Sequence, residues 1–335
     1  MNKKFELVPQ EGTHLFRIRA LRDFAKVKAG DLGGFVEKEQ NLSHDGTCWI
    51  YDNARVYNNA LIYDNARVYN NALIYDNARV YNNALIYDNA LIYDNAQVHN
   101  NALIYDNALI YNNARVYNNA QVYGNTRVYG NTLVSGNAKI TKYAIISGNA
   151  KIKDYVHVSG DAQVSGNAQV YDSALISGGA QVSGNAQVYN HARVYGSVQV
   201  YKEAHVNQKQ HIKFGHYTKN SLVDLLRCSL GVHPTEDGYI YVYKRVNIDY
   251  TSEHDNTFVY PKEGLVEAKE YNPDPAVSCD AGLHFSTNEY WPIKDETKQR
   301  MLLAEVHIDD IIACQEGKIR VKKAYIINRS QRSKS

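Results

Sequence analysis

Every sixth residue from Ile50 to Ile212 is isoleucine or valine. A period of six over such a length differs from the periods of 3.6 and 2 that a helix and a strand impose. It is typical of a repeat architecture, in which each unit buries its apolar face only by stacking on its neighbours. About half of the 335-residue chain is therefore predicted to form one continuous solenoid.

Each six-residue unit contains four alternating residues and a two-residue turn. In the unit 54–59, Ala54 and Val56 share one face while Arg55 and Tyr57 share the other, as expected of a strand. Aspartate, asparagine or glycine follows, and these residues tolerate positive φ best, so that each unit is predicted to form its own corner. The alanine column from 54 to 204 changes to other compact residues only at Thr126, Thr132, Val156 and Val198.

An aliphatic residue followed four positions later by a small one, as in Ile62 and Ala66, resembles the hexapeptide-repeat family, which includes trimeric acyltransferases. The resemblance implies a mainly β protein with a left-handed parallel β-helix of 18-residue triangular coils, about nine of them over 50–212. Parallel crossovers are usually right-handed, so the handedness comes from the resemblance alone.

The chain outside the repeat is predicted to form two further domains. Residues 1–49, with a strand at 15–21 and a turn-rich segment at 28–35, are expected to cap the first coil, because an uncovered coil exposes unpaired backbone groups. This segment resembles the caps of such repeats in uncharacterised bacterial and prophage proteins. Residues 213–335 are expected to form an α+β domain that ends in a disordered basic tail.

The C-terminal domain is predicted to contain two helices among several strands. One helix covers 221–230 with Ser221 as its N-cap, and a second lies near 289–300. The segments 279–285, 305–312 and 318–321 resemble an uncharacterised domain of phage and prophage proteins. The predicted strands are 239–246, 257–260, 264–270, 282–286, 302–308 and 318–327.

Charge and hydropathy exclude few functions. The chain has 37 lysine and arginine residues against 35 aspartate and glutamate residues, so that no strong nucleic-acid signal and no attraction to an acidic membrane follow. No apolar run is long enough for a signal peptide or a membrane span, and we expect a cytoplasmic protein. The four cysteines form no CxxC pair.

The repeat itself is a poor candidate for catalysis. Hexapeptide-repeat acyltransferases place a catalytic histidine near a loop that interrupts the coils, and no loop interrupts this repeat. The related zinc carbonic anhydrases need three converging histidines, yet His205 and His211 lie six residues apart on successive faces, with His216 nearby. No metal site is therefore predicted. Other outward histidines are read as surface substitutions: His99, His157 and His191.

The segment 279–291 holds the one plausible catalytic constellation, because it is dense in polar groups after a glycine. Its Gly-aliphatic-aromatic strand, the Ser-Thr pair and the Tyr-bearing helix that follow, and the next strand at 302–306 together resemble the core of ADP-ribosyltransferases. The matching positions are Arg245, the pair Ser286 and Thr287, and Glu305, which the resemblance assigns to NAD binding and catalysis. The second serine of the family's Ser-Thr-Ser strand is missing, and a generic hairpin-and-helix core explains the same pattern. No cofactor is predicted unless this alternative holds, in which case the cofactor is NAD.

Two outward columns of tyrosine and leucine recur every eighteen residues. Contiguous exposed apolar side chains predict a protein partner or self-association, whereas stacked tyrosines also stabilise a ladder by about 0.2 to 1 kcal/mol per pair. Both interpretations stay open. The first column comprises Tyr57, Tyr75, Tyr93, Tyr111 and Tyr129 beside Leu73, Leu91 and Leu109, and the second comprises Tyr51, Tyr69, Tyr87, Tyr105 and Tyr123 beside Leu85 and Leu103.

The twelve residues 54–65 recur identically at 66–77 and at 78–89. A module whose length varies by duplication suits spacing, display or multivalent binding better than a single active site. The leading hypothesis is a non-catalytic scaffold or binding protein of phage or prophage origin, which binds a protein partner with its solenoid and a C-terminal recognition domain. The alternatives are an ADP-ribosyltransferase-like enzyme and a divergent hexapeptide acyltransferase.

Overall fold

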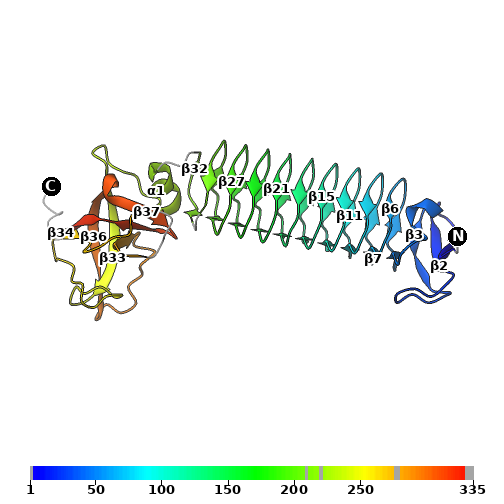
Figure 1. Cartoon of the computed structure of the whole chain (residues 1–335), viewed down its shortest axis with the longest axis horizontal. Helices are drawn as coiled ribbons and strands as arrows, with labels where there is room; N and C mark the ends of the chain where they lie inside the picture. Colours follow the sequence, from blue (N-terminus) through cyan, green and yellow to red (C-terminus); the bar gives the residue numbers. More distant parts are fainter. Residues whose placement is uncertain (1–2, 208–209, 219–221, 275–279, 329–335) are drawn as a thin grey trace. The chain divides into compact units, whose positions relative to one another are not determined.

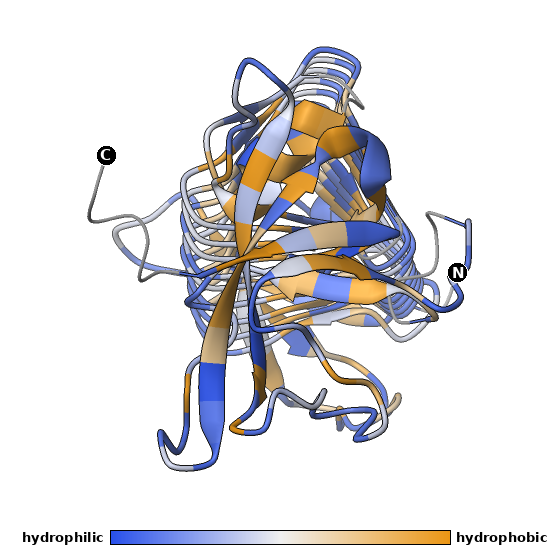
Figure 2. Cartoon of the chain, turned by 90° about the vertical axis from the view of Figure 1, so that its left-hand side faces the viewer, coloured by the Kyte–Doolittle hydropathy of each residue, from blue (hydrophilic) through white to orange (hydrophobic). Residues whose placement is uncertain are grey.

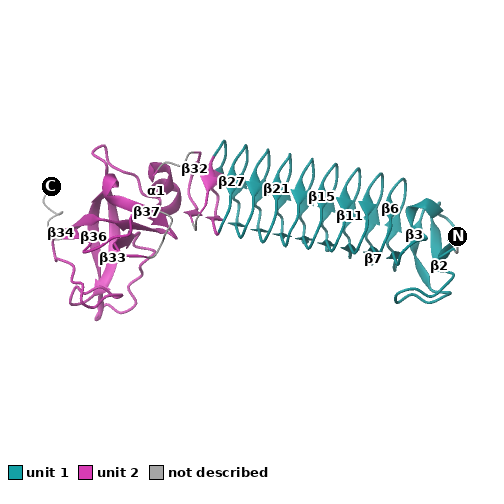
Figure 3. Cartoon of the chain, viewed as in Figure 1, with its two compact units in different colours: residues 1–190, 200–203 teal, residues 191–199, 204–335 magenta. Residues whose placement is uncertain are grey.

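The computed structural model describes residues 3–207, 210–218, 222–274 and 280–328 (Figure 1). The chain divides into two compact units, one of residues 1–190 and 200–203 and the other of residues 191–199 and 204–335 (Figure 3). This division assigns the last hexads to the second unit, whereas the sequence pattern places all of 50–212 in the repeat. The fold is mainly β, with a parallel β-solenoid of about 10 turns where about nine were predicted.

The first unit begins with three strands, β1 (Phe5–Pro9), β2 (Phe16–Ala20) and β3 (Leu32–Val36), and the short 3-10 helix η1 (Glu39–Asn41). Strand β2 pairs antiparallel with both β1 and β3, and β3 pairs parallel with the first solenoid strand of its sheet. The prediction of a turn-rich segment at 28–35 is wrong for β3. Its glycines permit close packing rather than a turn, since a Cβ on Gly34 would lie 2.5 Å from the Ala54 carbonyl oxygen.

The solenoid of the first unit has three parallel sheets, and each two-residue strand pairs with the strand one coil further along. The first sheet contains β5 (Arg55–Val56), β8 (Leu73–Ile74), β11 (Leu91–Ile92), β14 (Leu109–Ile110), β17 (Arg127–Val128), β20 (Ile145–Ile146), β23 (Gln163–Val164) and β26 (Gln181–Val182). The second contains β4 (Trp49–Ile50), β7 (Arg67–Val68), β10 (Leu85–Ile86), β13 (Leu103–Ile104), β16 (Gln121–Val122), β19 (Lys139–Ile140), β22 (His157–Val158) and β25 (Leu175–Ile176). The third contains β6 (Leu61–Ile62), β9 (Arg79–Val80), β12 (Gln97–Val98), β15 (Arg115–Val116), β18 (Leu133–Val134), β21 (Lys151–Ile152), β24 (Gln169–Val170) and β27 (Gln187–Val188).

The core of the solenoid consists of the alanine column and the isoleucine and valine column, which are both buried along the repeat. The predicted inward face is thus confirmed. The corners are confirmed as well: Asn58 and Asp76 have φ values of 56° and 58°, and from Gly124, at 79°, glycine shares this position with other residues. Two of the later corners are lysines, Lys142 at 64° and Lys202 at 60°. Six residues therefore suffice for one side of the triangle, because the strand and its left-handed corner residue are encoded together.

The second unit contains the two-residue strands β28 (Arg193–Val194), β30 (His205–Val206), β31 (His211–Ile212) and β32 (His216–Tyr217), the helix α1 (Leu222–Leu230) and an antiparallel sheet. Strand β29 (Gln199–Val200) spans the division between the units. Helix α1 contacts β31, β32 and β37 with its buried face, which includes Leu226 and Cys228. None of the helices that the structure describes is long and apolar enough to cross a membrane.

The antiparallel sheet has seven strands in the order β34, β39, β36, β33, β35, β38 and β37. Its strands carry most of the hydrophobic residues in this region, and the surrounding loops are mainly hydrophilic (Figure 2). The 3-10 helix η2 (Ile308–Asp310) precedes β37. The strands are β33 (Tyr239–Asn247), β34 (Gly264–Glu267), β35 (Leu283–Ser286), β36 (Gln299–His307), β37 (Ile311–Gln315), β38 (Lys318–Val321) and β39 (Lys323–Ile327).

Several local predictions in this sheet are wrong. Residues 289–300 form turns and the start of β36, because Pro292 has no N–H to donate and the Asp295 carboxylate accepts from the Thr297 amide at 2.9 Å. The segment 257–260 forms one isolated bridge, and 318–327 is two strands. Strand β37 was not predicted. The Ser221 cap and the basic tail at 329–335 lie outside the described residues.

Candidate functional site

The most regular outer surface of the first unit is the tyrosine face, which we define as Tyr57, Tyr75, Tyr93, Tyr111 and Tyr129 together with Leu73, Leu91 and Leu109. The leucines lie on β8, β11 and β14, and each tyrosine directly follows a strand of the same sheet. Consecutive rings stack with centroids 4.8 to 5.1 Å apart and planes within 10° of parallel. All eight side chains are half-buried, although the sequence predicted exposed columns.

The stacking decides which part of each ring meets the solvent. Both faces of an inner ring such as Tyr93 are covered by its neighbours, Tyr75 and Tyr111, so that ring edges and hydroxyl groups remain for a partner. Burial, and then the nearby phenols of Tyr57 and Tyr93, raise the pKa of Tyr75 to about 12. The Tyr75 hydroxyl is thus a neutral hydrogen-bonding group over the physiological range.

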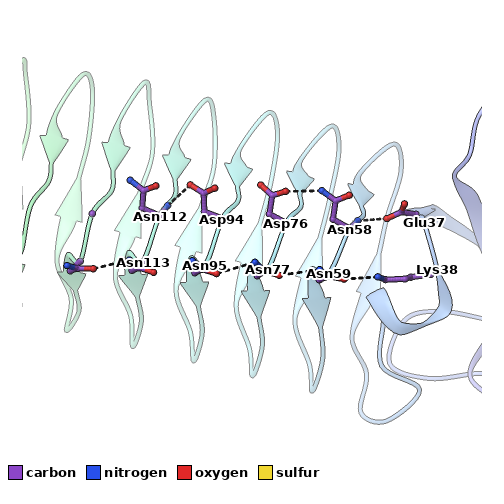
Figure 4. Close-up of a pocket in the computed structure, with 12 residues that line it drawn as sticks. Glu37, Lys38, Asn58, Asn59, Asp76, Asn77, Asp94, Asn95, Asn112 and Asn113 are labelled. Carbon is purple, nitrogen blue, oxygen red and sulfur yellow. Dashed lines mark hydrogen bonds between the residues drawn. The ribbon is translucent and has the colours of Figure 1, made fainter.

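A polar groove with a volume of about 870 Å³ runs beside the tyrosine face along the corner that follows it (Figure 4). Its walls are two columns of turn residues. In one, the Asn58 side-chain amide donates to Asp76 at 2.8 Å, and in the other, amide ladders join Asn59 to Asn77 and Asn77 to Asn95 at 3.3 Å. Each ladder amide retains a donor and an acceptor position that can serve a ligand.

The two neighbouring carboxylates in this groove are both hydrogen-bonded. Asp76 accepts from Asn58, and Asp94 accepts from the Asn112 backbone amide at 3.1 Å. Within the described ranges, no group of three or more histidine, cysteine, aspartate or glutamate residues is placed to hold a metal ion. His99 lies in a stack between Tyr81 and Tyr117, which is a packing position.

The structure distributes the residues matched to ADP-ribosyltransferases over separate contacts. The Arg245 Nε lies 3.0 Å from both carboxylate oxygens of Glu253. Ser286 is fully buried, and its hydroxyl donates to the Gly317 carbonyl oxygen. The Thr287 carbonyl oxygen accepts from the amide of Tyr290 at 3.2 Å.

Glu305 lies apart from Arg245 on the sheet. It accepts from the Tyr241 hydroxyl at 2.8 Å and faces Tyr241 across the β33 and β36 pair, whereas Arg245 faces Met301. Four residues of strand separate the two positions, a distance of about 13 Å. The structure does not bring these side chains together, and the role in NAD chemistry stays a prediction.

The second unit contains a cavity of about 380 Å³, and residues 280–284 and Trp291, from the segment that the sequence singled out, line part of it. Its other lining residues, Lys244 among them, were missed by sequence reasoning. The cavity is bounded by the end of β33, by β35 and β38, and by loops at 252–260, 268–270 and 291. Lys244 is its most unusual residue, since a lysine replaces the aliphatic residue expected at an inward position of β33 after Ile240 and Val242. That break in the alternation was the signal in the sequence. The side chains lining the cavity include Lys244, Tyr260, Trp291 and Lys318.

The contacts of the Lys244 ammonium are cation–π contacts with two aromatic rings, and no salt bridge to it is found among the described residues. Only 4% of Lys244 is exposed, and its Nζ lies 5.1 Å from the Trp291 ring centroid and 5.9 Å from that of Tyr260. Burial lowers the pKa of Lys244 to about 8, and the charges of Lys318 and Arg245 act in the same direction while Glu253 opposes them. A buried ammonium in an open cavity is a feature of functional sites.

The fold defines a repeat β-helix protein: a parallel β-solenoid joined to a small antiparallel sheet domain. The chain matches the family described as YdcK Beta solenoid repeat, and the match is confined to segments of the repeat. The matched residues are 60–74, 72–86, 84–100, 120–136, 162–178 and 186–202.

Among curated proteins, the chain is similar to Protein rIIB of Enterobacteria phage T4. The two are 31% identical over 81 residues, which cover 24% of this chain and 26% of the phage protein. The chain thus spans about a quarter of the length of this relative.

Proposed function

We propose that this protein is a non-catalytic scaffold or binding protein of phage or prophage type, which binds a protein partner or a second copy of itself through the tyrosine face. The similarity to Protein rIIB of phage T4 supports the proposed origin. The observation that carries the binding role is the repetition of identical half-buried side chains at one-coil spacing, at 4.8 to 5.1 Å between rings.

Repetition favours an extended partner over a compact ligand. The stacked rings offer edges and hydroxyls, and the groove beside them offers amide donors and acceptors over the same coils. A partner that lies along the solenoid can repeat one contact from coil to coil, so that several weak contacts add to a useful affinity. The leucines at 73, 91 and 109 supply the apolar area that such an interface buries.

The test places one charge on the tyrosine face of the full chain. Leu91→Glu puts a carboxylate between Leu73 and Leu109 on β11, whereas Gln163→Glu makes a carboxylate at the corresponding position of β23, beyond the tyrosines. Both residues point outward from the same sheet, so that the two variants share the chemistry and differ in the surrounding face.

Self-association is measured by the sedimentation of each variant over a range of concentrations. Binding to another protein is measured by a photo-crosslinking residue placed at position 91 or at position 163, in cells that carry the phage or prophage. If the chain self-associates, we expect Leu91→Glu to abolish the oligomer while Gln163→Glu keeps it. If it binds another protein, we expect the crosslinking residue at position 91 to yield one reproducible adduct that position 163 does not yield. A monomer at every concentration, together with equal crosslinking from both positions, would contradict the proposed interface.

A further inference from the structure

The cavity around Lys244 combines a buried cation with aromatic walls. Phe258, Tyr260 and Trp291 contribute rings, and Lys318, which lies 3.8 Å from the Glu316 carboxylate, contributes a second ammonium. Lys269 and the carboxylates of Asp255, Glu270 and Asp280 also line the cavity. Asp255 accepts from the Thr257 hydroxyl and Asp280 accepts from the Asn272 side-chain amide, so that these two carboxylates are hydrogen-bonded within their own loops. The volume of about 380 Å³ is within the range of about 300 to 1,000 Å³ that small-molecule sites occupy.

The Lys244 ammonium has three N–H donors and meets no hydrogen-bond acceptor among the residues that the structure describes. The rings of Tyr260 and Trp291 attract the charge but accept no conventional hydrogen bond. The nearby carboxylate of Glu253 is bound by Arg245 and, at 2.5 Å, by the Gln299 side-chain amide. An ammonium buried in this way opposes folding unless a ligand or another group completes its contacts.

A second hydrogen-bond donor that lines the cavity has no acceptor among the described residues. The Trp291 indole Nε1 is buried, and no described residue accepts its proton. It lines the same cavity as Lys244, so that an acceptor entering there could satisfy both groups. The two unsatisfied donors and the ring walls call for a ligand with anionic oxygens at one end and a flat or apolar body.

We propose that this cavity binds a small organic anion, with its phosphate or carboxylate on Lys244 and Lys318 and its aromatic or aliphatic body between Tyr260 and Trp291. The oxygens accept from the ammonium groups, and the body replaces solvent along the rings. This inference does not depend on the tyrosine face, which lies in the first unit.

The first experiment is calorimetric titration of the whole 335-residue chain with four probes. Phenyl phosphate and benzoate carry both an anion and a ring, benzyl alcohol has the ring alone, and inorganic phosphate has the anion alone. We expect one of the first two to bind at least about tenfold more tightly than the last two. No binding of phenyl phosphate or benzoate at about 10 mM, or equal binding of all four probes, would overturn the proposal.

A matched pair of variants locates the bound anion. Lys244→Met keeps the length of the side chain and removes the charge. We expect it to raise the dissociation constant of the preferred probe at least about tenfold. Lys262→Met is the control, because Lys262 also lies over a ring, that of Tyr250 at 5.7 Å, but outside the cavity. Unchanged affinity in folded Lys244→Met would refute the assignment.

A measurement on the unaltered protein covers the case in which Lys244→Met does not fold. Lysine acetylation is followed by peptide mass spectrometry with and without the preferred probe. We expect the probe to slow acetylation of Lys244 severalfold and to leave Lys262 unaffected. Equal rates at Lys244 in both samples would show that the anion binds elsewhere.

Discussion

At the scale of single residues, Lys244 is the position where folding and binding oppose each other. Its ammonium is almost fully buried on β33, where the alternation otherwise places Ile240, Val242 and Val246. Taking a charge out of water without a counterion is unfavourable, and burial accordingly lowers the pKa of Lys244 to about 8. A residue selected only for stability at this position would be apolar, so that its charge indicates a function.

Replacing Lys244 by methionine should therefore stabilise the protein. We expect Lys244→Met to raise the free energy of unfolding near pH 7 by up to about 3 kcal/mol, since a pKa lowered from 10.5 to about 8 measures the penalty on the charged form. Between about pH 8 and 10.5 the unfolded state binds more protons at this residue than the folded state does, so that its penalty in the wild type fades as the pH rises.

The measurement is urea unfolding of both proteins at about pH 7 and about pH 10. The advantage of Lys244→Met should be largest at the lower pH and shrink at the higher one, and Lys262→Met should unfold like the wild type at both. A variant that is less stable than the wild type near pH 7 would show that the ammonium is satisfied within the fold.

The sequence predicted which residues are buried in the solenoid, but it did not predict which side chains of the second unit lie next to one another. The inward alanine, isoleucine and valine columns were predicted because one unit repeats many times, and each repetition restates the same burial pattern. Arg245 and Glu305 were grouped from a linear pattern, but the register of β33 with β36 places them four positions apart. That register is set by contacts distant in the sequence, which no local pattern contains.

At the scale of elements, the outer surface of the solenoid is stabilised because side chains of the same type stack on one another in successive coils. Tyrosine rings 4.3 to 5.1 Å apart shield one another, and asparagine amides form ladders at the corners. Shielding has a measurable consequence for ionisation. Burial comes first among the causes that raise the pKa of Tyr51, Tyr75 and Tyr105 to about 12, and phenols of adjacent coils add to it.

The stability of the protein should consequently fall in strong alkali. The folded state holds phenolic protons that the unfolded state releases above about pH 10, so that stability is lost progressively as the pH rises from about 10 toward 12. Urea unfolding at about pH 9 and about pH 11 measures the loss. The triple variant Tyr51→Phe, Tyr75→Phe and Tyr105→Phe keeps the ring stacks without those hydroxyls, and its loss should be smaller. An identical loss in the triple variant would mean that other groups cause it.

The elements of the second unit were harder to predict than those of the first. The helix α1 and strand β33 have clear local patterns and were predicted. The prediction of a helix at 289–300 was wrong because it left out the effects of Pro292 and of the Asp295 side chain on the backbone. Strand β37 was missed because its residues 311–314 form a continuous apolar run without the period of two that marks a half-buried strand. Strands whose partners lie far along the chain carry weaker local signals than repeated ones.

At the scale of the whole molecule, the repeat confines each contact of the solenoid to the adjacent coils. Strand β19 at Lys139–Ile140 pairs with β16 and β22, each eighteen residues away, and with no strand further along. Stability is then approximately a sum over coils and their interfaces. The number of coils can therefore change, whereas the phase, which is the register of inward and outward positions from one coil to the next, cannot.

Deleting one whole coil should leave the solenoid folded. Removal of residues 139–156 joins Ala138 to His157, which occupies the same strand position as Lys139 in the same sheet. The deletion of 139–155 is one residue shorter and puts Val156 where an outward residue belongs. We expect cooperative thermal unfolding, followed by circular dichroism, for the first variant and a large loss of stability for the second. Similar unfolding of both would mean that the phase of the coils is not fixed by the columns.

The exact twelve-residue copies over 54–89 have a period different from the eighteen-residue spacing of stacked positions. Successive turns therefore present different halves of the copy: Arg67 pairs with Leu85, and Asn58 binds Asp76, so that equal charges are kept apart. Gain of one copy by slippage in the gene would advance every later hexad by two of the three sides. Copy number would thus act as a rotary setting, which determines the side on which each later residue faces outward and returns to its starting orientation only after three insertions.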